Sequence, residues 1–522
     1  MTTSRESLGL IAITSLSAVL FIASFTYSVG HAIDDGIHIV TAQAMATGQG
    51  LRLISDPAGP VSTQFPPALS LLLVPVLWIF PHVPDNVIPL KLIPAACAVL
   101  FVVVSWYWFR RYHPCATAFW LTSLVALNPE TVRFSGSVIA EMGYGFATML
   151  SIICFERTQE SGSNKDMRRA LILAILAITA AYLFRSVGLA LVLAAVGTML
   201  LRRRWSAAAL IAIGFLICAS PWLMKGALVG TPEYQQQFWL NDLENPELGT
   251  IGIQGLVDRS LVNAPAYLLT AIPNHLFPPL GGQRVIALFQ SGRVLSVLTA
   301  VQISISLLVL MGFLYRLRNR WGFVDLYMVV YFGILMIWHT RLQWKYLAPI
   351  TPILLLYLTQ GIQWALSYVP SAHGYSKRIL TCVFVLMIMG AAIRSADYLE
   401  RGWLFGGADD PYRPAYEWIK NSTPEDSILM GFDHLALYLY TGRQAVAASM
   451  SNRPDVSMAY VRGTKPDFFV TGRTIVKGTG PSLDEKYLLP VIEQYPEIFS
   501  LVYSDNASSI DVYSVHLPVA EP

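Results

Sequence analysis

Two adjacent carboxylates, Asp34 and Asp35, follow an uncharged apolar run at residues 8–29. Acids beside a membrane can bind a divalent metal ion or accept a proton from an attacking hydroxyl group. His38 lies one helical turn further on, where it could support the acids or be a plain surface residue. The alternative is that two solvated acids simply end a helix. We therefore take Asp34 and Asp35 as candidate catalytic residues and His38 as possible support.

A third acid, Glu141, falls inside the apolar pattern of residues 138–155. A carboxylate at that depth is costly unless it is paired, so it is a functional candidate by default. The alternative is a structural salt bridge with Arg133 in the preceding loop.

Cations are expected at the same end of the spans. Arg185 closes an apolar run, and Arg341 and Lys345 stand shortly before another. Positive side chains on the outer side favour the binding of an anion, and a phosphate group fits the paired N–H donors of arginine. The alternative is that these side chains reach to the membrane interface. Acids and phosphate-binding cations together are what transfer from a membrane-anchored phosphate donor needs, since the cations would neutralise the leaving phosphate.

The composition places these residues in a membrane protein. The 522 residues are 54% hydrophobic and 13% charged, about half the charged share of a soluble domain. A wholly soluble protein and a disordered chain are excluded, and the net charge of +3 does not suggest nucleic acid as a partner. All the cysteines lie in apolar runs, so neither a disulfide framework nor a zinc site is expected.

About eleven apolar runs are long enough to cross a membrane. Clusters of Arg and Lys lie between some of these runs. They all fall on the cytoplasmic side if the runs alternate across the membrane from an N-terminus inside the cell, as the cytoplasmic excess of Lys and Arg requires. This holds only if the short, proline-broken run 67–82 does not cross the membrane and instead lies along the outer face or re-enters it. The runs are 8–29, 88–109, 115–131, 138–155, 170–184, 187–201, 206–223, 293–315, 321–339, 346–366 and 379–396.

The spacing predicts a membrane domain over 1–396, with long outer loops at 30–87 and 224–292, and an outer soluble domain over 397–522. Alternating segments indicate a small α/β fold for the tail. Helices are expected at 416–420, 435–441 and 485–494, and strands at 427–431, 445–449, 467–471, 499–504 and 511–515.

Four ordered landmarks resemble the GT-C glycosyltransferases that use polyprenyl-phosphate sugars, in the branch of protein mannosyltransferases and lipid A aminoarabinose transferases. They are the pair Asp34-Asp35 followed by Gly36, Gln64-Phe65-Pro66-Pro67 opening a juxtamembrane helix, Asn128-Pro129 before Glu141, and residues 341–349. The tail segment 424–443 also resembles the outer domain of bacterial members.

The resemblance implies that Asp34 is the catalytic base or orients the acceptor, that Asp35 supports it and that Glu141 completes the acidic site. The lipid phosphate would lie near Arg185, Arg341 and Lys345. The uncharged pair Gln64-Phe65 is a departure, since the aminoarabinose branch often carries an acidic–basic pair before the two prolines; this removes one phosphate contact and argues against that specificity. Gln64 and Arg133, like His38, are taken as possible supporting residues.

We therefore expect a mainly α, polytopic GT-C fold and an inverting transferase that moves a hexosyl or pentosyl group from a polyprenyl phosphate to a lipid, glycan or protein. The active site and the tail would lie on the extracytoplasmic side of the plasma membrane. No cofactor is required, although Asp34, Asp35 and Glu141 would allow a divalent metal. The alternatives are a transporter or flippase of lipid-linked sugars, and an O-antigen ligase or polymerase with Arg259, His275 and Arg284 in its outer loop and Arg293 just beyond it.

Overall fold

A computed structural model describes most of the chain. The described residues are 4–31, 33–160, 163–229, 233–243, 248–278, 292–339, 344–369, 375–405, 412–472, 482–505 and 508–518.

Each predicted apolar run coincides with a helix. Apolar side chains suit lipid, and a helix satisfies its backbone polar groups internally, as a hydrocarbon environment demands. Among the described residues, six helices are long and apolar enough to cross a membrane, namely α1, α4, α8, α10, α15 and α18. The helices on the predicted runs are α1 (Ser4–Ala23), α4 (Val87–Tyr112), α5 (Cys115–Leu127), α7 (Glu141–Glu160), α8 (Asn164–Phe184), α9 (Leu189–Leu201), α10 (Trp205–Val229), α15 (Gly292–Arg320), α16 (Phe323–Ile337), α17 (Thr351–Ser367) and α18 (Ser376–Phe405).

The first outer loop contains two helices that pack on each other, α2 (Ile33–Ala46) and α3 (Ala68–Ile79). The hydroxyl of Ser70 on α3 lies 2.9 Å from that of Thr41 on α2. One side of α3 is buried, while Trp78 and Ile79 are 68% and 70% exposed. A short helix with an exposed apolar side suits the position along the outer membrane face that the sequence predicts for 67–82.

The second outer loop is also largely helical. Its elements are α11 (Glu233–Trp239), α12 (Ile253–Pro265), η3 (Ala266–Ala271) and α13 (Ile272–Leu276). The amide of Asn263 donates to the carbonyl oxygens of Leu335 and Trp338, at 3.2 and 2.9 Å. Because the last carbonyls of a helix have no partner within it, these bonds fasten the loop to the end of α16. Two short helices, α6 (Pro129–Ser135) and η1 (Ser186–Gly188), lead into α7 and α9, while η4 (Trp344–Tyr346) and η5 (Ala348–Ile350) precede α17.

The C-terminal segment folds as the predicted α/β layer. Its sheet has the order β2-β1-β3-β5-β4, with β1 parallel to β2 and β3, and β5 antiparallel to β3 and β4. Every predicted strand and helix is present, and one helix, α21, lies where none is predicted. The strands are β1 (Ile428–Gly431), β2 (Gln444–Ala447), β3 (Phe468–Thr471), β4 (Phe499–Asp505) and β5 (Ile510–Val515). The helices are α19 (Arg413–Ser422), α20 (His434–Thr441), α21 (Pro454–Thr464), η7 (Asp484–Leu488) and α22 (Leu489–Gln494).

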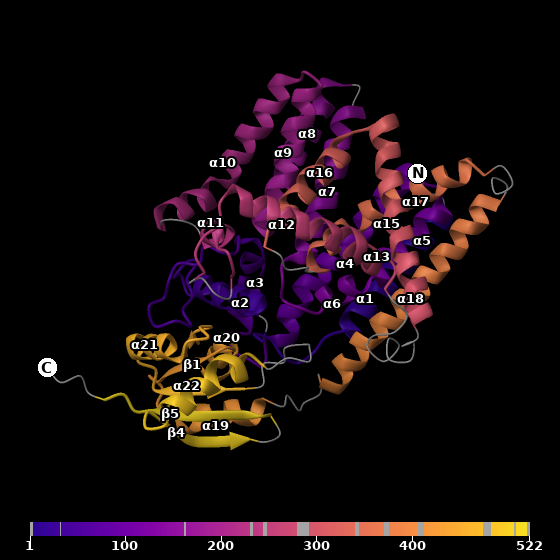
Figure 1. Cartoon of the computed structure of the whole chain (residues 1–522). Coiled ribbons are helices and arrows are strands. Elements are labelled where there is room, and N and C mark those ends of the chain that lie inside the picture. Colours follow the sequence, from indigo (N-terminus) through magenta and orange to yellow (C-terminus); the bar gives the residue numbers. More distant parts are fainter. Residues whose placement is uncertain are drawn as a thin grey trace.

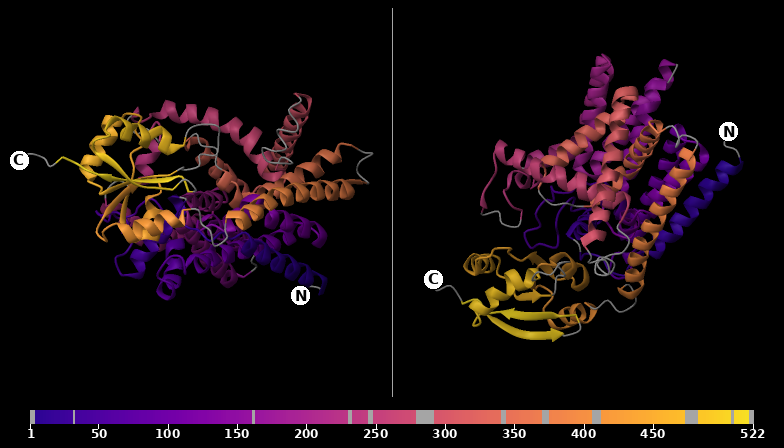
Figure 2. Two further views of the ribbon diagram at one scale, coloured as in Figure 1. Left: turned by 90° about the horizontal axis from the view of Figure 1, so that it is seen from below. Right: turned by 45° about the vertical axis from the view of Figure 1, so that its right-hand side comes forward.

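The C-terminal layer lies at one end of the helical bundle, beside α2 and α3 (Figure 1). A second direction of view gives the same arrangement (Figure 2). Arginines mark the other end, because the last turn of α4 carries Arg110 and Arg111 and that of α15 carries Arg318 and Arg320. The bundle therefore has a basic end and an end that carries the outer loops and the sheet.

Candidate functional site

Asp34 stands in the first turn of α2, where the helix dipole favours a negative charge. Its Oδ2 accepts a hydrogen bond from Nζ of Lys345 on η4 at 2.7 Å. Burial would raise the pKa of the Asp34 carboxyl, but the positive charges of Lys345 and Arg185 outweigh it and hold the pKa below its ordinary value. Asp34 is therefore ionised at neutral pH and could accept a proton once Lys345 is drawn away.

Glu141 and Arg185 form a second ion pair, in which the Arg185 guanidinium donates to Oε1 of Glu141. Glu141 begins α7 and Arg185 ends α8, so the acid lies at a helix N-terminus and the cation at a helix C-terminus. The Glu141 side chain is only 1% exposed, and a carboxylate buried so deeply needs a partner of this kind. The alternative partner Arg133 is wrong; it pairs at 3.6 Å with Glu130, one helical turn away on α6.

The two pairs are neighbours. The guanidinium of Arg185 lies 5.7 Å from the ring centre of Tyr346, and Nζ of Lys345 lies 5.9 Å from the same centre. Arg185 is also close enough to Asp34 to lower its pKa. The starts of α2 and α7, the end of α8 and η4 thus bring two acids and two cations to one place, at the end of the bundle that carries the sheet.

Buried tyrosines pack around the two ion pairs, and they were not among the residues predicted from the sequence. The hydroxyl of Tyr331 on α16 donates to the carbonyl oxygen of Tyr346 at 2.7 Å, which fixes the backbone next to Lys345. The hydroxyls of Tyr144 and Tyr327 lie 3.0 Å apart. The signal for Tyr144 was available, because it follows Glu141 by three residues on the same helix.

Asp35 and His38 have different surroundings from Asp34. The carboxylate of Asp35 accepts a hydrogen bond from the backbone N–H of Gly30 at 3.0 Å, which fixes the chain as it enters α2. His38 is buried, with Nδ1 3.2 Å from the Ser70 hydroxyl and its ring 5.1 Å from that of Phe65. Burial lowers the pKa of His38 to about 4, against the opposing effect of Asp34, so its ring is neutral at pH 7.

For the remaining candidates, Gln64 and Arg341, no contact with either ion pair is described. Gln64 is half-buried and precedes Phe65, whose ring contacts that of His38 in a tilted arrangement. Arg341 lies outside the described residues.

The described residues contain no group of three His, Cys, Asp or Glu side chains arranged to hold a metal ion. Asp34 contacts Lys345, Asp35 contacts Gly30 and Glu141 contacts Arg185. Each of the three acids is therefore held by a different partner.

The residues that suggested a ligase have structural contacts where they are described. The Arg259 guanidinium donates to the carbonyl oxygens of Phe238 and Leu240, which tie α12 to the end of α11. The Nε2 atom of His275 is 2.7 Å from the hydroxyl of Thr351. Arg284 and the side chain of Arg293 lie outside the described part.

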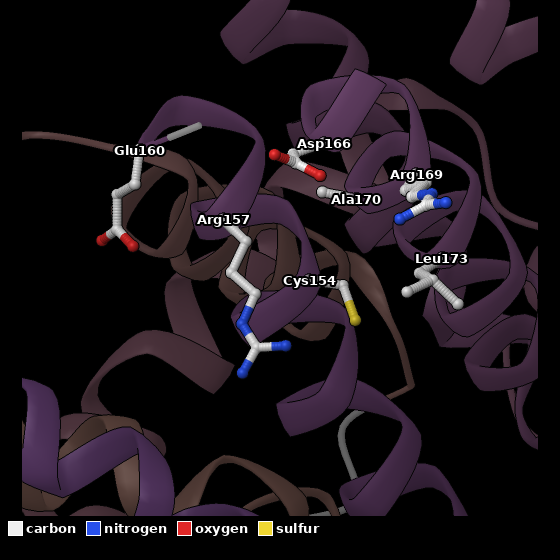
Figure 3. A pocket seen from close by; sticks show the side chains of 7 residues that line it. All are labelled: Cys154, Arg157, Glu160, Asp166, Arg169, Ala170 and Leu173. Atoms are coloured by element: carbon white, nitrogen blue, oxygen red, sulfur yellow. The ribbon is translucent and has the colours of Figure 1, made fainter. Parts of the chain in front are cut away.

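One described hollow is far from the two ion pairs. It has a volume of about 330 Å³ and lies between the end of α7 and the start of α8 (Figure 3). Glu141 and Glu160 are at opposite ends of α7, roughly 30 Å apart at 1.5 Å per residue. The hollow therefore belongs to the basic end of the bundle. Its lining residues are Cys154, Arg157, Glu160, Asp166, Arg169, Ala170 and Leu173.

Comparison with known proteins identifies the fold. No family model and no curated protein matches the chain. Among solved structures, ArnT from Cupriavidus metallidurans bound to undecaprenyl phosphate aligns with a TM-score of 0.59 and 14% identity, over 98% of this chain and 99% of that one. Its apo form aligns with the same score over 98% of both chains. The oligosaccharyltransferase AglB from Archaeoglobus fulgidus, in complex with an inhibitory peptide and a dolichol-phosphate, gives 0.57 and 12% identity, over 99% of this chain and 76% of that one. The chain is thus a multi-pass membrane protein with the fold of the GT-C glycosyltransferases.

Proposed function

We propose that this protein is a glycosyltransferase that moves a sugar from a polyprenyl-phosphate donor to a hydroxyl group of a lipid, glycan or protein. The observation that carries the proposal is the meeting of Asp34–Lys345 with Glu141–Arg185, because it supplies a proton acceptor beside cations suited to phosphate. The fold supports it, since the ArnT and AglB structures with this fold were obtained with undecaprenyl phosphate and dolichol-phosphate.

The donor phosphate would compete with Asp34 for Lys345. A phosphate binding to Lys345 and Arg185 replaces the carboxylate on the lysine, and Asp34 then turns to the acceptor. Glu141 keeps the Arg185 guanidinium oriented throughout. Binding of the donor thus prepares the base that the transfer step requires.

In the transfer step, Asp34 takes the proton of the acceptor hydroxyl as the hydroxyl oxygen attacks the anomeric carbon of the donor sugar. The bond between that carbon and the phosphate oxygen breaks, and its electron pair leaves with the polyprenyl phosphate. Lys345 and Arg185 stabilise the negative charge that develops on the phosphate. Attack from the face opposite the phosphate inverts the configuration of the sugar.

The site would lie outside the cytoplasm. Lysine and arginine are enriched on the cytoplasmic side of membrane proteins. Arg110 and Arg111 end α4, and Arg318 and Arg320 end α15, at the end of the bundle opposite the sheet. This charge distribution supports our proposal that Asp34 and the C-terminal layer lie on the extracytoplasmic side of the plasma membrane.

Turnover of extracted polyprenyl-phosphate sugars tests the proposal. The purified protein is compared with Asp34→Asn and Glu141→Gln, and release of free polyprenyl phosphate is followed by mass spectrometry. The matched control is Asp455→Asn, another ion-paired acid, which pairs with Arg453 in the C-terminal layer. We expect release by the wild type and by Asp455→Asn but not by Asp34→Asn. Release that survives Asp34→Asn would remove Asp34 as the base.

The transporter alternative predicts a different outcome. If no donor is turned over, and the protein instead moves lipid-linked sugars across vesicles, the transferase proposal is wrong.

A further inference from the structure

Helix α20 belongs to two apolar cores. It lies between β1 and β2, and its residues Ala436 and Leu437 pack in the core of the C-terminal layer. Its residues Leu435 and Leu439 are instead part of the core formed by the membrane helices, and both are at most 8% exposed. The C-terminal layer is therefore joined to the membrane part through the side chains of this helix.

The contact between α20 and the start of α2 is so close that it requires glycine. A Cβ atom on Gly36 would lie 2.6 Å from Cβ of Leu435. A Cβ atom on Gly30, whose φ is +87°, would lie 3.2 Å from the Cα atom of Ala436. In addition, the backbone N–H of Val29 donates to the hydroxyl of Tyr440 at 3.0 Å.

The helix held by this contact is the one that carries Asp34. Gly36 follows Asp34 by two residues, and α3 holds α2 further along through Thr41 and Ser70. Since α2 is packed against both α20 and α3, a displacement at Gly36 must move the first turn of α2 relative to Lys345.

We propose that α20 is a positioning element for catalysis: its contact with Gly36 sets the place of Asp34 opposite Lys345. The inference rests on the proposed function, because it assigns the C-terminal layer a part in the same transfer reaction. An alanine at position 36 would need about 0.8 Å more room to reach ordinary contact with Leu435. Misplacement of a catalytic group by about 1 Å can cost about 100-fold in rate.

Gly36→Ala is the first test, with Gly463→Ala as its matched control. Gly463 lies in α21 of the same layer, and a Cβ there meets nothing within 4 Å. We expect Gly36→Ala to lower kcat by about 10- to 100-fold with KM for the polyprenyl-phosphate sugar nearly unchanged. The second substitution Leu435→Gly removes the clashing Cβ and should restore at least part of kcat. An unchanged kcat in Gly36→Ala would overturn the proposal.

A second pair of variants separates positioning from loss of stability. Leu435→Ala removes contact with α2, whereas Leu437→Ala removes contact inside the C-terminal layer. We expect the first to lower kcat more than the second at an equal loss of unfolding temperature. An equal loss of kcat in both would mean that α20 acts only through stability, and the proposal would be wrong.

Hydrogen exchange supplies a readout that does not depend on turnover. In Gly36→Ala, amides over 33–46 should exchange faster than in the wild type, and Leu435→Gly should reverse the change. If the wild type turns over no donor, the proposed function fails, while exchange still decides whether α20 holds α2. Unchanged exchange in Gly36→Ala would exclude that contact as a determinant of the position of α2.

Discussion

Lys345 and Asp34 are 311 residues apart in the chain, yet Nζ of the lysine donates to Oδ2 of the aspartate at 2.7 Å. Each side chain is about a quarter exposed, so the pair is accessible to a ligand and still shielded from bulk water. This is the property that an exchangeable ion pair needs: it holds the carboxylate ionised until a stronger anion takes the lysine.

Replacement of Lys345 by Gln should therefore move the pH dependence of the reaction. Lys345 and Arg185 hold the pKa of Asp34 below its ordinary value, so activity that needs the carboxylate is present at neutral pH and is lost as pH falls through that pKa. Without Lys345, the effect of burial weighs more and the pKa rises. The acidic limb of kcat/KM should shift to higher pH, with a loss of about 100-fold at neutral pH. Lys420→Gln, an exposed lysine of α19, should behave as the wild type. An acidic limb that stays in place would contradict this role of Lys345.

Glu141 and Arg185 should be coupled in stability. Removal of one partner of a buried ion pair leaves the other charge uncompensated and costs about 3–5 kcal/mol. Glu141→Gln should therefore lower the unfolding temperature in detergent, and addition of Arg185→Gln should recover part of the loss. Glu417→Gln, which breaks an exposed pair with Arg413, should change stability little. If the effects of the two single changes at 141 and 185 simply add, the pair is not coupled.

The sequence located the apolar helices because the length of an apolar run is tied physically to the thickness of a bilayer. Six of the described helices are long and apolar enough to cross a membrane, and the crossing of all eleven runs stays a prediction. Short apolar segments predicted the strands of the C-terminal layer for a comparable reason, since both faces of the central strands pack in a core: Leu429 and Met430 belong to different cores. Helix α21 at Pro454–Thr464 was missed, because its apolar residues are interrupted by polar ones and form no long apolar run. The contact of α20 with α2 could not be predicted, because it joins segments about 400 residues apart and depends mainly on their complementary shapes.

For the candidate site, the sequence indicated which charged residues are unusual but not which of them pair with each other. An acid or a cation at the end of an apolar run is unusual in itself, and this signal selected Asp34, Glu141, Arg185 and Lys345. Sequence proximity suggested Arg133 for Glu141, whereas the partner is Arg185, at the end of the adjacent antiparallel helix. Which charges meet depends on how α7, α8 and η4 pack, and that information is spread over their whole apolar surfaces.

Helices α15 and α17 cross at two glycines, and both should be intolerant of alanine. A Cβ on Gly312 would lie 1.8 Å from the carbonyl oxygen of Tyr357, and one on Gly361 would lie 1.8 Å from that of Leu308. Backbone atoms cannot give way as a flexible side chain can, so the helices must separate, at a cost of about 1–3 kcal/mol.

Thermal unfolding in detergent measures this cost for Gly312→Ala and Gly361→Ala. The control is Gly333→Ala in α16, where a Cβ meets nothing within 4 Å. Alanine is the better helix former by about 1 kcal/mol, so this control should keep or raise the unfolding temperature. Equal unfolding temperatures for all three variants would show that the crossing tolerates a methyl group.

Asp433, which precedes α20, should make stability depend on pH. Burial, together with the negative charges of Asp484 and Asp35, raises its pKa to about 7 from an ordinary 3.8. Between these two values the folded chain keeps a proton that the unfolded chain has released. Stability due to this group therefore falls as pH rises from about 4 to about 7, and it levels off above that range.

Asp433→Asn keeps the shape of the side chain and cannot ionise. We expect its unfolding temperature to equal that of the wild type near pH 4 and to exceed it above pH 7. Asp426→Asn, an exposed acid in the turn before β1, should follow the wild type throughout. A wild-type profile that runs parallel to that of Asp433→Asn over this range would show that the carboxyl of Asp433 does not hold its proton at the junction between α20 and α2.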